Sequence, residues 1–234
     1  KITLKIKRIY IDIFRAPVEK PIVTSFGTIP SRGVSMLRSE DSDGVAGWGN
    51  LWGNFPAITT EYRTKLAVFT WSNLLLGKTV DDIPSFYRDL VESLHVLIVQ
   101  ADEPGPVAAV LSATEQAIWD LAARRANLPL RKLLNLDAVD RIPDNASGLK
   151  PSNGPQVLAF QRSCGRRNFK LKTGFGEDVD KENVHRIMDR LSPGERFFAD
   201  ANQRWDLDSS IYAADWFADA GGGWFEEPML ADTS

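Results

Sequence analysis

The sequence has few of the residues that build disulfides and histidine-rich metal sites. Its 234 residues include one cysteine, Cys164, and two histidines, His95 and His185. A single cysteine excludes an internal disulfide and fits a reducing compartment, so we expect a cytoplasmic protein. Both histidines fall in helix-like segments and are too few for a histidine-rich metal site, so we interpret them as structural.

Long apolar runs and a strong net charge are also missing. No apolar run approaches the roughly 18 residues of a membrane span, and the alternating first residues do not resemble a signal peptide. The net charge is −3 and no basic cluster is interleaved with aromatic residues, which argues against nucleic acid as a partner. With 43% hydrophobic and 25% charged residues, the composition is that of an ordinary globular protein of one or two domains.

The first part of the chain predicts strands. Residues 5–14 and 33–39 show strand patterns, and residues 21–28 between them predict a loop with small hydroxyl side chains. Residues 41–44 read Asp-Ser-Asp-Gly, which predicts a hairpin connection. The glycine-rich and aromatic residues 47–56 predict a further loop, which would pack its tryptophans into a core.

Helical patterns follow these strands. Residues 59–76, 81–99 and 107–125 carry apolar residues at helical spacing, separated by glycine and proline breaks. Strands first and helices after them predict an α+β domain. Residues 142–147 predict the first strand of a second region, followed by a helix over residues 156–164.

Residues 169–176 form the stretch from which the function is best interpreted. Apolar and basic residues alternate there, which predicts a β-strand with Lys170 and Lys172 on one face. Two neighbouring ammonium groups repel each other, so each should lose its proton more easily and could act as a general base near neutral pH. Taken alone, a Lys-x-Lys pair is more often a solvated edge strand, so the sequence that follows decides between the interpretations.

Two later apolar runs end in carboxylates, Asp200 and Glu226. Asp200 lies 28 positions after Lys172 and Glu226 lies 26 positions after Asp200, with helix-like segments at 178–191 and 206–220 between them. This spacing suits one strand, one helix and two turns, so three parallel strands would present charged side chains at their C-terminal ends. A basic pair followed by two carboxylates suggests a base beside a hard cation such as Mg²⁺.

In this order and spacing, three motifs resemble the enolase superfamily, and within it the mandelate racemase and muconate lactonizing enzyme group. The motifs are Lys170-Leu171-Lys172, Asp200-Ala201-Asn202 and Glu226-Glu227-Pro228. The resemblance implies an α+β capping domain over residues 1–135, followed from residue 136 by a (β/α)8-type, TIM-like barrel. Each motif alone is a weak signal, but their ordered combination is a strong one.

The resemblance also implies a role for each charged residue. Lys172 would be the base that takes the proton α to a substrate carboxylate. Lys170 would tune the charge of Lys172 and hold that carboxylate. Asp200 and Glu226 would be the first two ligands of a Mg²⁺ ion.

Further residues are implied around this centre. Asn202 would line the same pocket, and Glu227 would support the metal ligands from behind. In the resembled family, loops of the capping domain close over the barrel mouth and select the substrate. This makes Thr24, Phe26 and Trp52 candidates for substrate binding.

The barrel is expected to be incomplete. A (β/α)8 barrel takes about 250 residues, whereas residues 142–234 suffice for roughly four strands. The third metal carboxylate and the second acid/base group of the resembled family are not found. We therefore expect residues 136–234 to be the first part of the barrel domain of a longer enzyme or a truncated product, with an exposed parallel edge.

The reaction implied is Mg²⁺-dependent removal of the proton α to a carboxylate, through an enediolate intermediate. It would be completed as dehydration of a sugar acid, by a lyase, or as racemisation or epimerisation, by an isomerase. The polar loop residues Thr24, Ser25 and Asn50 favour a sugar acid or a related small carboxylate as substrate, and we expect a homo-oligomer with no nucleic-acid or membrane partner. Two alternatives remain: a Schiff-base (β/α)8 aldolase with Lys172 as nucleophile, and a non-catalytic truncated chain that retains the motifs.

Overall fold

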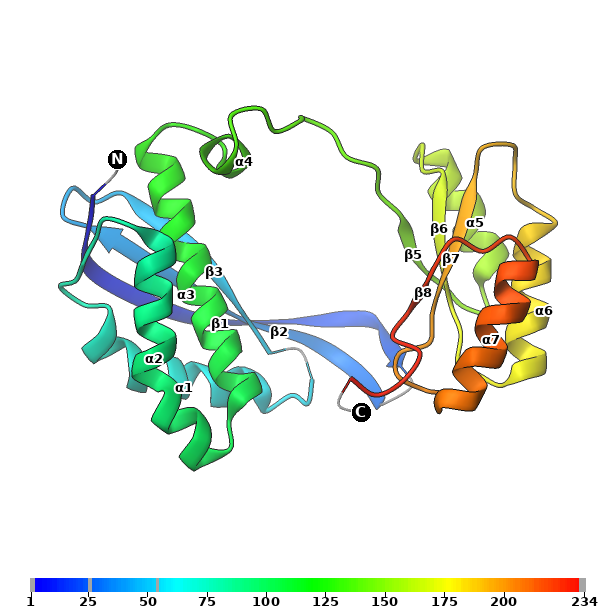
Figure 1. The fold of residues 1–234 in the computed structure, drawn as a ribbon, viewed down its shortest axis with the longest axis horizontal. Coiled ribbons are helices and arrows are strands. Elements are labelled where there is room, and N and C mark those ends of the chain that lie inside the picture. Colours follow the sequence, from blue (N-terminus) through cyan, green and yellow to red (C-terminus); the bar gives the residue numbers. More distant parts are fainter. Residues whose placement is uncertain (1–2, 25–26, 54, 232–234) are drawn as a thin grey trace. The chain divides into compact units, whose positions relative to one another are not determined.

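The computed structural model describes residues 3–24, 27–53 and 55–231 and divides into two compact units, Lys1–Val139 and Asp140–Ser234 (Figure 1). Each unit has its own cluster of buried apolar side chains. Burial of apolar surface therefore stabilises each unit from within. Over the described ranges, no helix combines the length and the apolar character needed to cross a membrane.

The first unit packs helices against an antiparallel sheet whose strands lie in the order β3-β2-β1-β4. Its elements in chain order are β1 (Leu4–Thr24), β2 (Gly27–Asp41), β3 (Ala46–Trp52), α1 (Thr59–Leu74), β4 (Thr79–Val80), α2 (Ile83–Ala101), α3 (Pro104–Arg125) and α4 (Leu130–Leu134). The three helices predicted from the sequence are confirmed, with ends that differ by up to three residues. Asp82 begins α2, because its carboxylate accepts a hydrogen bond from the backbone N–H of Ser85 at 2.9 Å.

The long hairpin of β1 and β2 corrects one prediction. The sequence predicts a loop over residues 21–28, but β1 continues to Thr24, β2 starts at Gly27, and Ile22 pairs with Ile29. Ile22, Val23 and Thr28 of this segment are β-branched residues, which favour a pleated strand. The register of the two strands shifts between Pro17 and Ile22. Proline has no backbone N–H, so it cannot donate a hydrogen bond to the neighbouring strand.

Strand β3 corrects a second prediction. Of the glycine-rich residues 47–56 predicted as a loop, those up to Trp52 belong to strand β3, which pairs with β2 along its whole length. Trp48 and Trp52 do not enter the core, since they are 39% and 56% exposed. The predicted turn between β2 and β3 is present, with Gly44 at a φ of 84°.

Helix α3 lies directly on β3 because the strand has glycines on the face that meets the helix. A Cβ atom on Gly49 would lie 1.9 Å from the backbone oxygen of Ala113 in α3. The helix also covers the open edge of β3, where the carboxylate of Asp120 accepts the backbone N–H of Trp48 at 2.9 Å. An edge N–H that is satisfied in this way is not available to another strand.

The second unit alternates strands and helices. Its elements in chain order are β5 (Ala146–Leu149), α5 (Gly154–Ser163), β6 (Asn168–Lys172), α6 (Glu177–Met188), β7 (Arg196–Asp200), α7 (Leu207–Asp219) and β8 (Phe225–Glu226). In the described residues these strands form a parallel sheet in the order β5-β6-β7-β8, as expected for the first strands of a barrel. The first strand starts at Ala146 and not at Ile142, which is 80% exposed and precedes Pro143.

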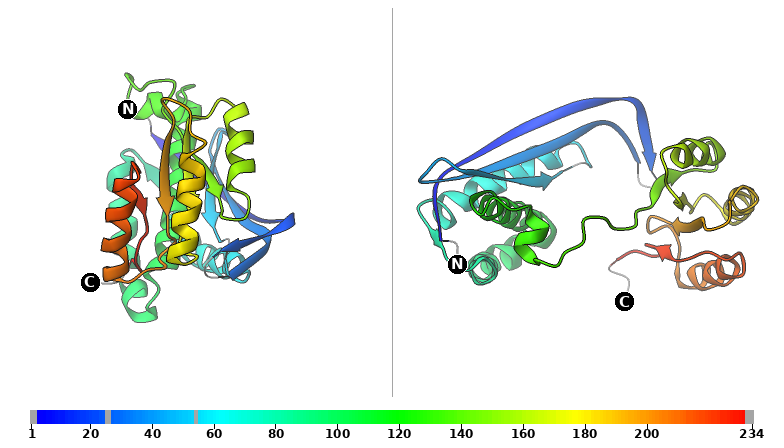
Figure 2. Two further views of the ribbon diagram at one scale, coloured as in Figure 1. Left: turned by 90° about the vertical axis from the view of Figure 1, so that its right-hand side faces the viewer. Right: turned by 90° about the horizontal axis from the view of Figure 1, so that it is seen from above.

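The three helices of this unit cover one face of its sheet (Figure 2). Phe169 and Leu171 of β6 are fully buried on that face, in a cluster with Val184 and Ile187 of α6. Side chains alternate along a strand, so Lys170 and Lys172 lie on the opposite face. The apolar and basic alternation of β6 thus separates a packed face from a face that carries charge.

Candidate active site

The C-terminal ends of β6, β7 and β8 bring charged residues into one row. In the parallel register Lys172 pairs with Asp200, and Asp200 pairs with Glu226. Lys170 lies two residues before Lys172 and therefore on the same face of β6. The strand ends that carry these residues form the edge where parallel βα folds place their chemistry.

Lys172 is held by two polar side chains. Its ammonium nitrogen Nζ lies 2.5 Å from Oδ2 of Asp200 and 2.9 Å from Oδ1 of Asn202. The Asp200 side chain is only 2% exposed, and its Oδ1 accepts the backbone N–H of Asn202 at 3.0 Å. Solvent and salt screen a partly buried ion pair of this kind less than an exposed one, so the attraction between its charges is stronger.

Lys170 lies between both carboxylates. Its Nζ is 2.6 Å from Oε2 of Glu226 and 3.4 Å from Oδ2 of Asp200, and its side chain is 12% exposed. Burial is the largest single influence on the pKa of Lys170 and lowers it, but the hydrogen bond that Lys170 donates to Glu226 and the charge of Asp200 together outweigh burial and raise the pKa. From the sequence, each lysine is expected to have a lowered pKa because of the charge on the neighbouring lysine. For Lys170 that expectation is wrong, because its ammonium lies between the carboxylates of Glu226 and Asp200.

The loop after β7 meets the loop after β8 through Glu227. Its two carboxylate oxygens lie 3.4 Å from Nδ2 of Asn202 and 3.3 Å from Nε2 of Gln203. The backbone N–H of Gln203 donates to the carbonyl of Glu227 at 2.7 Å. Asn202, Gln203 and Glu227 all have positive φ, at 49°, 62° and 46°. Gln203 is absent from the sequence prediction, although its place directly after Asn202 is a usable signal.

Two aromatic residues also lie at the site and were not predicted. Phe198 and Trp224 stack with ring centroids 4.6 Å apart, and Nζ of Lys170 lies 5.9 Å from the centroid of the Trp224 ring. Each ring stands two residues before a carboxylate, at Asp200 and Glu226. Strand alternation therefore places the rings on the face of the carboxylates, and this spacing is the signal that could have found them.

The three predicted substrate-binding residues belong to the first unit. Thr24 ends β1, and Trp52 ends β3 with its ring 5.1 Å from the guanidinium of Arg63. Phe26 lies outside the described residues. The role of these three residues in substrate binding stays a prediction.

The donor set of the charged row fits a hard divalent cation. Asp200 and Glu226 supply carboxylate oxygens, and one ammonium, that of Lys170, touches both, so a single positive charge can be shared by the two carboxylates. Within the described residues no group of three His, Cys, Asp or Glu side chains is placed to hold a metal ion. Mg²⁺ needs only one or two protein carboxylates when water and substrate complete its shell, whereas a zinc site requires more nitrogen or sulfur ligands.

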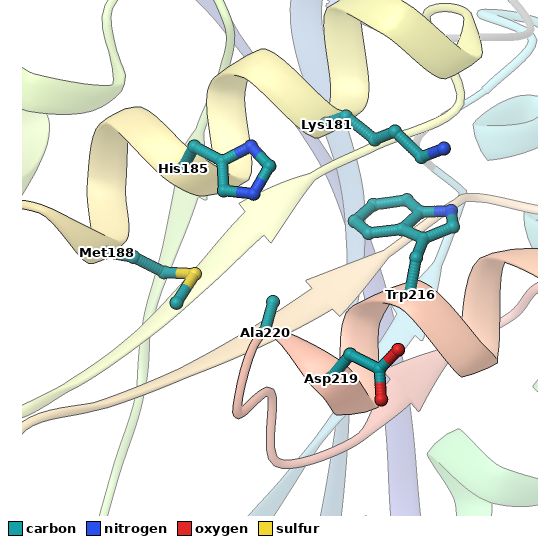
Figure 3. A pocket seen from close by; sticks show the side chains of 6 residues that line it. All are labelled: Lys181, His185, Met188, Trp216, Asp219 and Ala220. Atoms are coloured by element: carbon teal, nitrogen blue, oxygen red, sulfur yellow. The ribbon is translucent and has the colours of Figure 1, made fainter.

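A separate pocket lies between the outer helices α6 and α7 (Figure 3). It is lined by Lys181, His185, Met188, Trp216, Asp219 and Ala220. None of the predicted site residues lines this pocket. The chemistry suggested by the sequence therefore belongs to the strand ends and not to this surface.

Two protein families match the chain. Residues 8–135 match the family described as mandelate racemase / muconate lactonizing enzyme, N-terminal domain. Residues 156–234 match the family described as enolase C-terminal domain-like. The first match falls within the first unit and the second within the second unit.

Individual relatives agree with these matches. The chain is 29% identical to a 3,6-anhydro-alpha-L-galactonate cycloisomerase of Streptomyces coelicolor, over 97% of this chain and 63% of the relative. A crystal structure of a mandelate racemase/muconate lactonizing enzyme from Bordetella bronchiseptica superposes with a TM-score of 0.89 at 35% identity, covering 100% of this chain and 61% of the other. A racemase from Streptomyces coelicolor with bound magnesium superposes with a TM-score of 0.87 at 26% identity, over 97% of this chain and 64% of the other. The chain thus spans less than two thirds of each of these proteins. Further relatives are named as a cycloisomerase, an epimerase and a dehydratase.

Proposed function

The chain belongs to the mandelate racemase and muconate lactonizing enzyme group of the enolase superfamily, and from this membership we propose that the whole protein removes the proton α to the carboxylate of a small acid. The observation that carries the proposal is the position of Lys172. Its ammonium lies within hydrogen-bonding distance of Asp200 and Asn202, at the C-terminal edge of the parallel sheet. A base is useful for this reaction only beside groups that orient the substrate and hold its charge.

Lys172 is proposed as the base. A lysine accepts a proton only in its neutral form, whereas only its charged form makes the ion pair with Asp200. Asp200 must therefore be engaged elsewhere before Lys172 can act. Asn202 remains as a neutral partner for the Nζ atom and would keep the lysine aimed while it carries no charge.

Asp200 and Glu226 are proposed to hold Mg²⁺, which would supply a fixed positive charge beside the substrate carboxylate. The support is the pair of converging carboxylates and the magnesium in the structure of the Streptomyces racemase. The same carboxylate oxygens now accept hydrogen bonds from both lysines. Lys170, once released from Glu226, would be free to contact the substrate carboxylate.

We further propose a sugar acid or a close derivative as the substrate. The support is the names of three relatives, a 3,6-anhydro-alpha-L-galactonate cycloisomerase, a D-galactarolactone cycloisomerase and an L-talarate/galactarate dehydratase. Asn202, Gln203 and Glu227 form a polar rim beside the proposed base and suit a polyhydroxylated molecule. Dehydration, racemisation and epimerisation all start with the same proton removal, so the first step is the part to test.

The test is solvent deuterium incorporation by the protein in its native full length. A panel of aldonic and aldaric acids is incubated with the protein and MgCl2 in D2O, and loss of the α-proton signal is followed by NMR. We expect Lys172→Ala to abolish the exchange that the unaltered protein catalyses. Lys181→Ala is the matched control, because Lys181 also forms an ion pair in this unit, with Glu177, but lies on helix α6. Undiminished exchange in the Lys172 variant would contradict the proposal.

A second measurement separates proton removal from Schiff-base chemistry. A Schiff base between Lys172 and a carbonyl substrate would be trapped by borohydride as a covalent adduct. We expect no adduct on Lys172 after incubation with an accepted acid, and loss of exchange in the presence of a chelator. A trapped adduct at Lys172 would favour an aldolase.

A further inference from the structure

Asp180 is a buried carboxylate that the proposed reaction does not use. It lies in α6 with its residue 0% exposed. Its Oδ2 accepts the backbone N–H of Gly174 at 2.8 Å, and its Oδ1 accepts that of Phe175 at 3.3 Å. Its own backbone N–H donates to the carbonyl of Gly176 at 2.8 Å. One residue thus binds three successive residues of the loop between β6 and α6.

This loop follows the proposed base directly. Lys172 is the last residue of β6, and only Thr173 separates it from Gly174. The backbone N–H of Thr173 donates to the carbonyl of Asp200 at 3.0 Å, which ties the start of the loop to the neighbouring strand end. The loop therefore connects the two partners of the Lys172–Asp200 ion pair to helix α6.

The loop is also packed closely against the segment after Asp200. Gly174 has a φ of 88°, and a Cβ atom there would lie 2.8 Å from Cβ of Arg204 and 2.9 Å from the carbonyl oxygen of Ala201. Only glycine suits both the left-handed backbone and this approach. The position of Gly174 is thus set on one side by the neighbouring loop and on the other by Asp180.

Burial of this carboxylate requires an explanation beyond the stability of α6. Burial raises the pKa of Asp180, and the backbone N–H groups of Gly174, Phe175 and Gly176 offset only part of that rise. The first turn of α6 already carries Glu177 and Asp178, which are exposed and satisfy the helix dipole without any burial. Asp180 therefore adds little to the stability of the helix start beyond these two residues. What it adds is its hydrogen bonds to the loop.

We infer that Asp180 is a positioning residue for Lys172, which fixes the backbone after β6 so that the Nζ atom meets Asp200 and Asn202. The inference rests on the proposed role of Lys172 as the base. Displacement of a reacting group by about 1 Å can lower a rate about a hundredfold, so a residue that fixes the base acts on the reaction without touching the substrate. Its effect passes through two hydrogen bonds to the loop and one residue of backbone.

The experiment compares Asp180→Asn with Asp178→Asn in the full-length protein, without substrate. Both variants lose one carboxylate from the first turns of α6, but only Asp180 is buried and bound to the loop. Amide hydrogen exchange of Gly174 and Phe175 is measured together with the Cε–Nζ NMR correlation of Lys172, assigned with Lys172→Arg. Exchange at Leu171 and Phe197, two buried strand residues, reports whether the unit stays folded.

We expect Asp180→Asn to accelerate exchange at Gly174 and Phe175 by about tenfold or more, to shift the Lys172 correlation, and to leave Leu171 and Phe197 protected. Asp178→Asn should change none of these signals. An unmoved Lys172 correlation despite faster loop exchange would overturn the inference, because Asp180 would then serve the loop alone. If Asp180→Asn does not fold, Asp180→Ser, whose hydroxyl can still accept one N–H, must give the same Lys172 shift. The hydrogen-exchange and NMR measurements need no enzymatic turnover, so their outcome is independent of the deuterium test with Lys172→Ala.

Discussion

Lys172 and Asp200 lie opposite each other on neighbouring parallel strands, with Nζ of the lysine 2.5 Å from Oδ2 of the aspartate. The pair combines the proposed base with a proposed metal ligand. The same carboxylate cannot use one lone pair for both the ammonium and a cation, so the two occupants compete for it. This competition makes the pair testable by metal binding alone, without knowledge of the substrate.

Substitutions on the two sides of this pair should change Mg²⁺ affinity in opposite directions. Asp200→Asn should weaken Mg²⁺ binding by more than about tenfold, the low end of the loss when even an outer partner of a metal site is removed. Lys172→Met should strengthen binding, because it removes both a competitor for Asp200 and a like charge beside the cation. Isothermal titration calorimetry with MgCl2 measures both. Asp215→Asn, an exposed position on α7, is the control and should leave the affinity unchanged. Equal affinity in all three variants would place the metal elsewhere.

Glu195 should stabilise the folded protein at neutral pH and lose this effect in acid. Its carboxylate receives hydrogen bonds from Arg162 at 2.8 and 2.7 Å and from the backbone of Ser192 at 2.9 Å, and its side chain is fully buried. The bonds from Arg162 outweigh burial and lower the pKa of Glu195 from 4.5 to about 2. A lowered pKa in the folded state means that the stabilisation is complete above pH 4.5 and is lost as the pH falls through about 2.

Glu195→Gln tests this dependence. At pH 7 it should lower the free energy of unfolding by roughly 1–2 kcal/mol, less than the pKa shift alone implies. The reason is that Arg162 and Arg167, which also pairs with Glu195 at 3.3 Å, are both partly exposed to solvent. The difference from the unaltered protein should shrink as the pH falls from 4.5 towards 2, in urea unfolding followed by circular dichroism. Asp144→Asn is the control, since Asp144 forms an exposed pair with Arg166 at 3.2 Å, and it should change stability by less than about 0.5 kcal/mol. A difference that stays constant across this pH range would show that the Arg162 bonds do not depend on the carboxylate charge.

Gly49 should be among the least replaceable residues of the first unit. Gly49→Ala would place a methyl group 1.9 Å from the backbone oxygen of Ala113, and a helix backbone cannot move away as a flexible side chain can. We expect a loss of about 1–3 kcal/mol or more in the free energy of unfolding, measured by the urea midpoint.

Gly105→Ala is the matched control for this substitution. Gly105 lies in α3, and an added Cβ atom would meet no described atom within 4 Å. Alanine restricts the unfolded chain more than glycine does, so this variant should be unchanged or more stable by about 0.4–1 kcal/mol. If Gly49→Ala is tolerated as well as Gly105→Ala, then α3 does not lie directly on β3.

The sequence alone was sufficient to predict the alternation of strands and helices in the second unit and the row of charged residues at its strand ends. The reason is that a period of two and the spacing of a βα repeat are local properties of the chain. The same periodicity could also have found Phe198 and Trp224, which stand two residues before the carboxylates. In the first unit, the helices were predictable for the same reason, because apolar spacing and capping residues such as Asp82 mark them locally.

Other features depend on which segments meet in space, and only the tertiary structure decided them. In the long β1–β2 hairpin, Ile22 pairs with Ile29 on the neighbouring strand. The glycines of β3 allow α3 to pack directly against this strand. The raised pKa of Lys170 comes from carboxylates on two other strands, which no local pattern around the lysine contains. The role of Asp180 also depends on the tertiary structure. In the sequence it is only one more acidic residue at the start of a helix. Its burial and its hold on Gly174 arise only where the helix packs back against the strand end that carries Lys172.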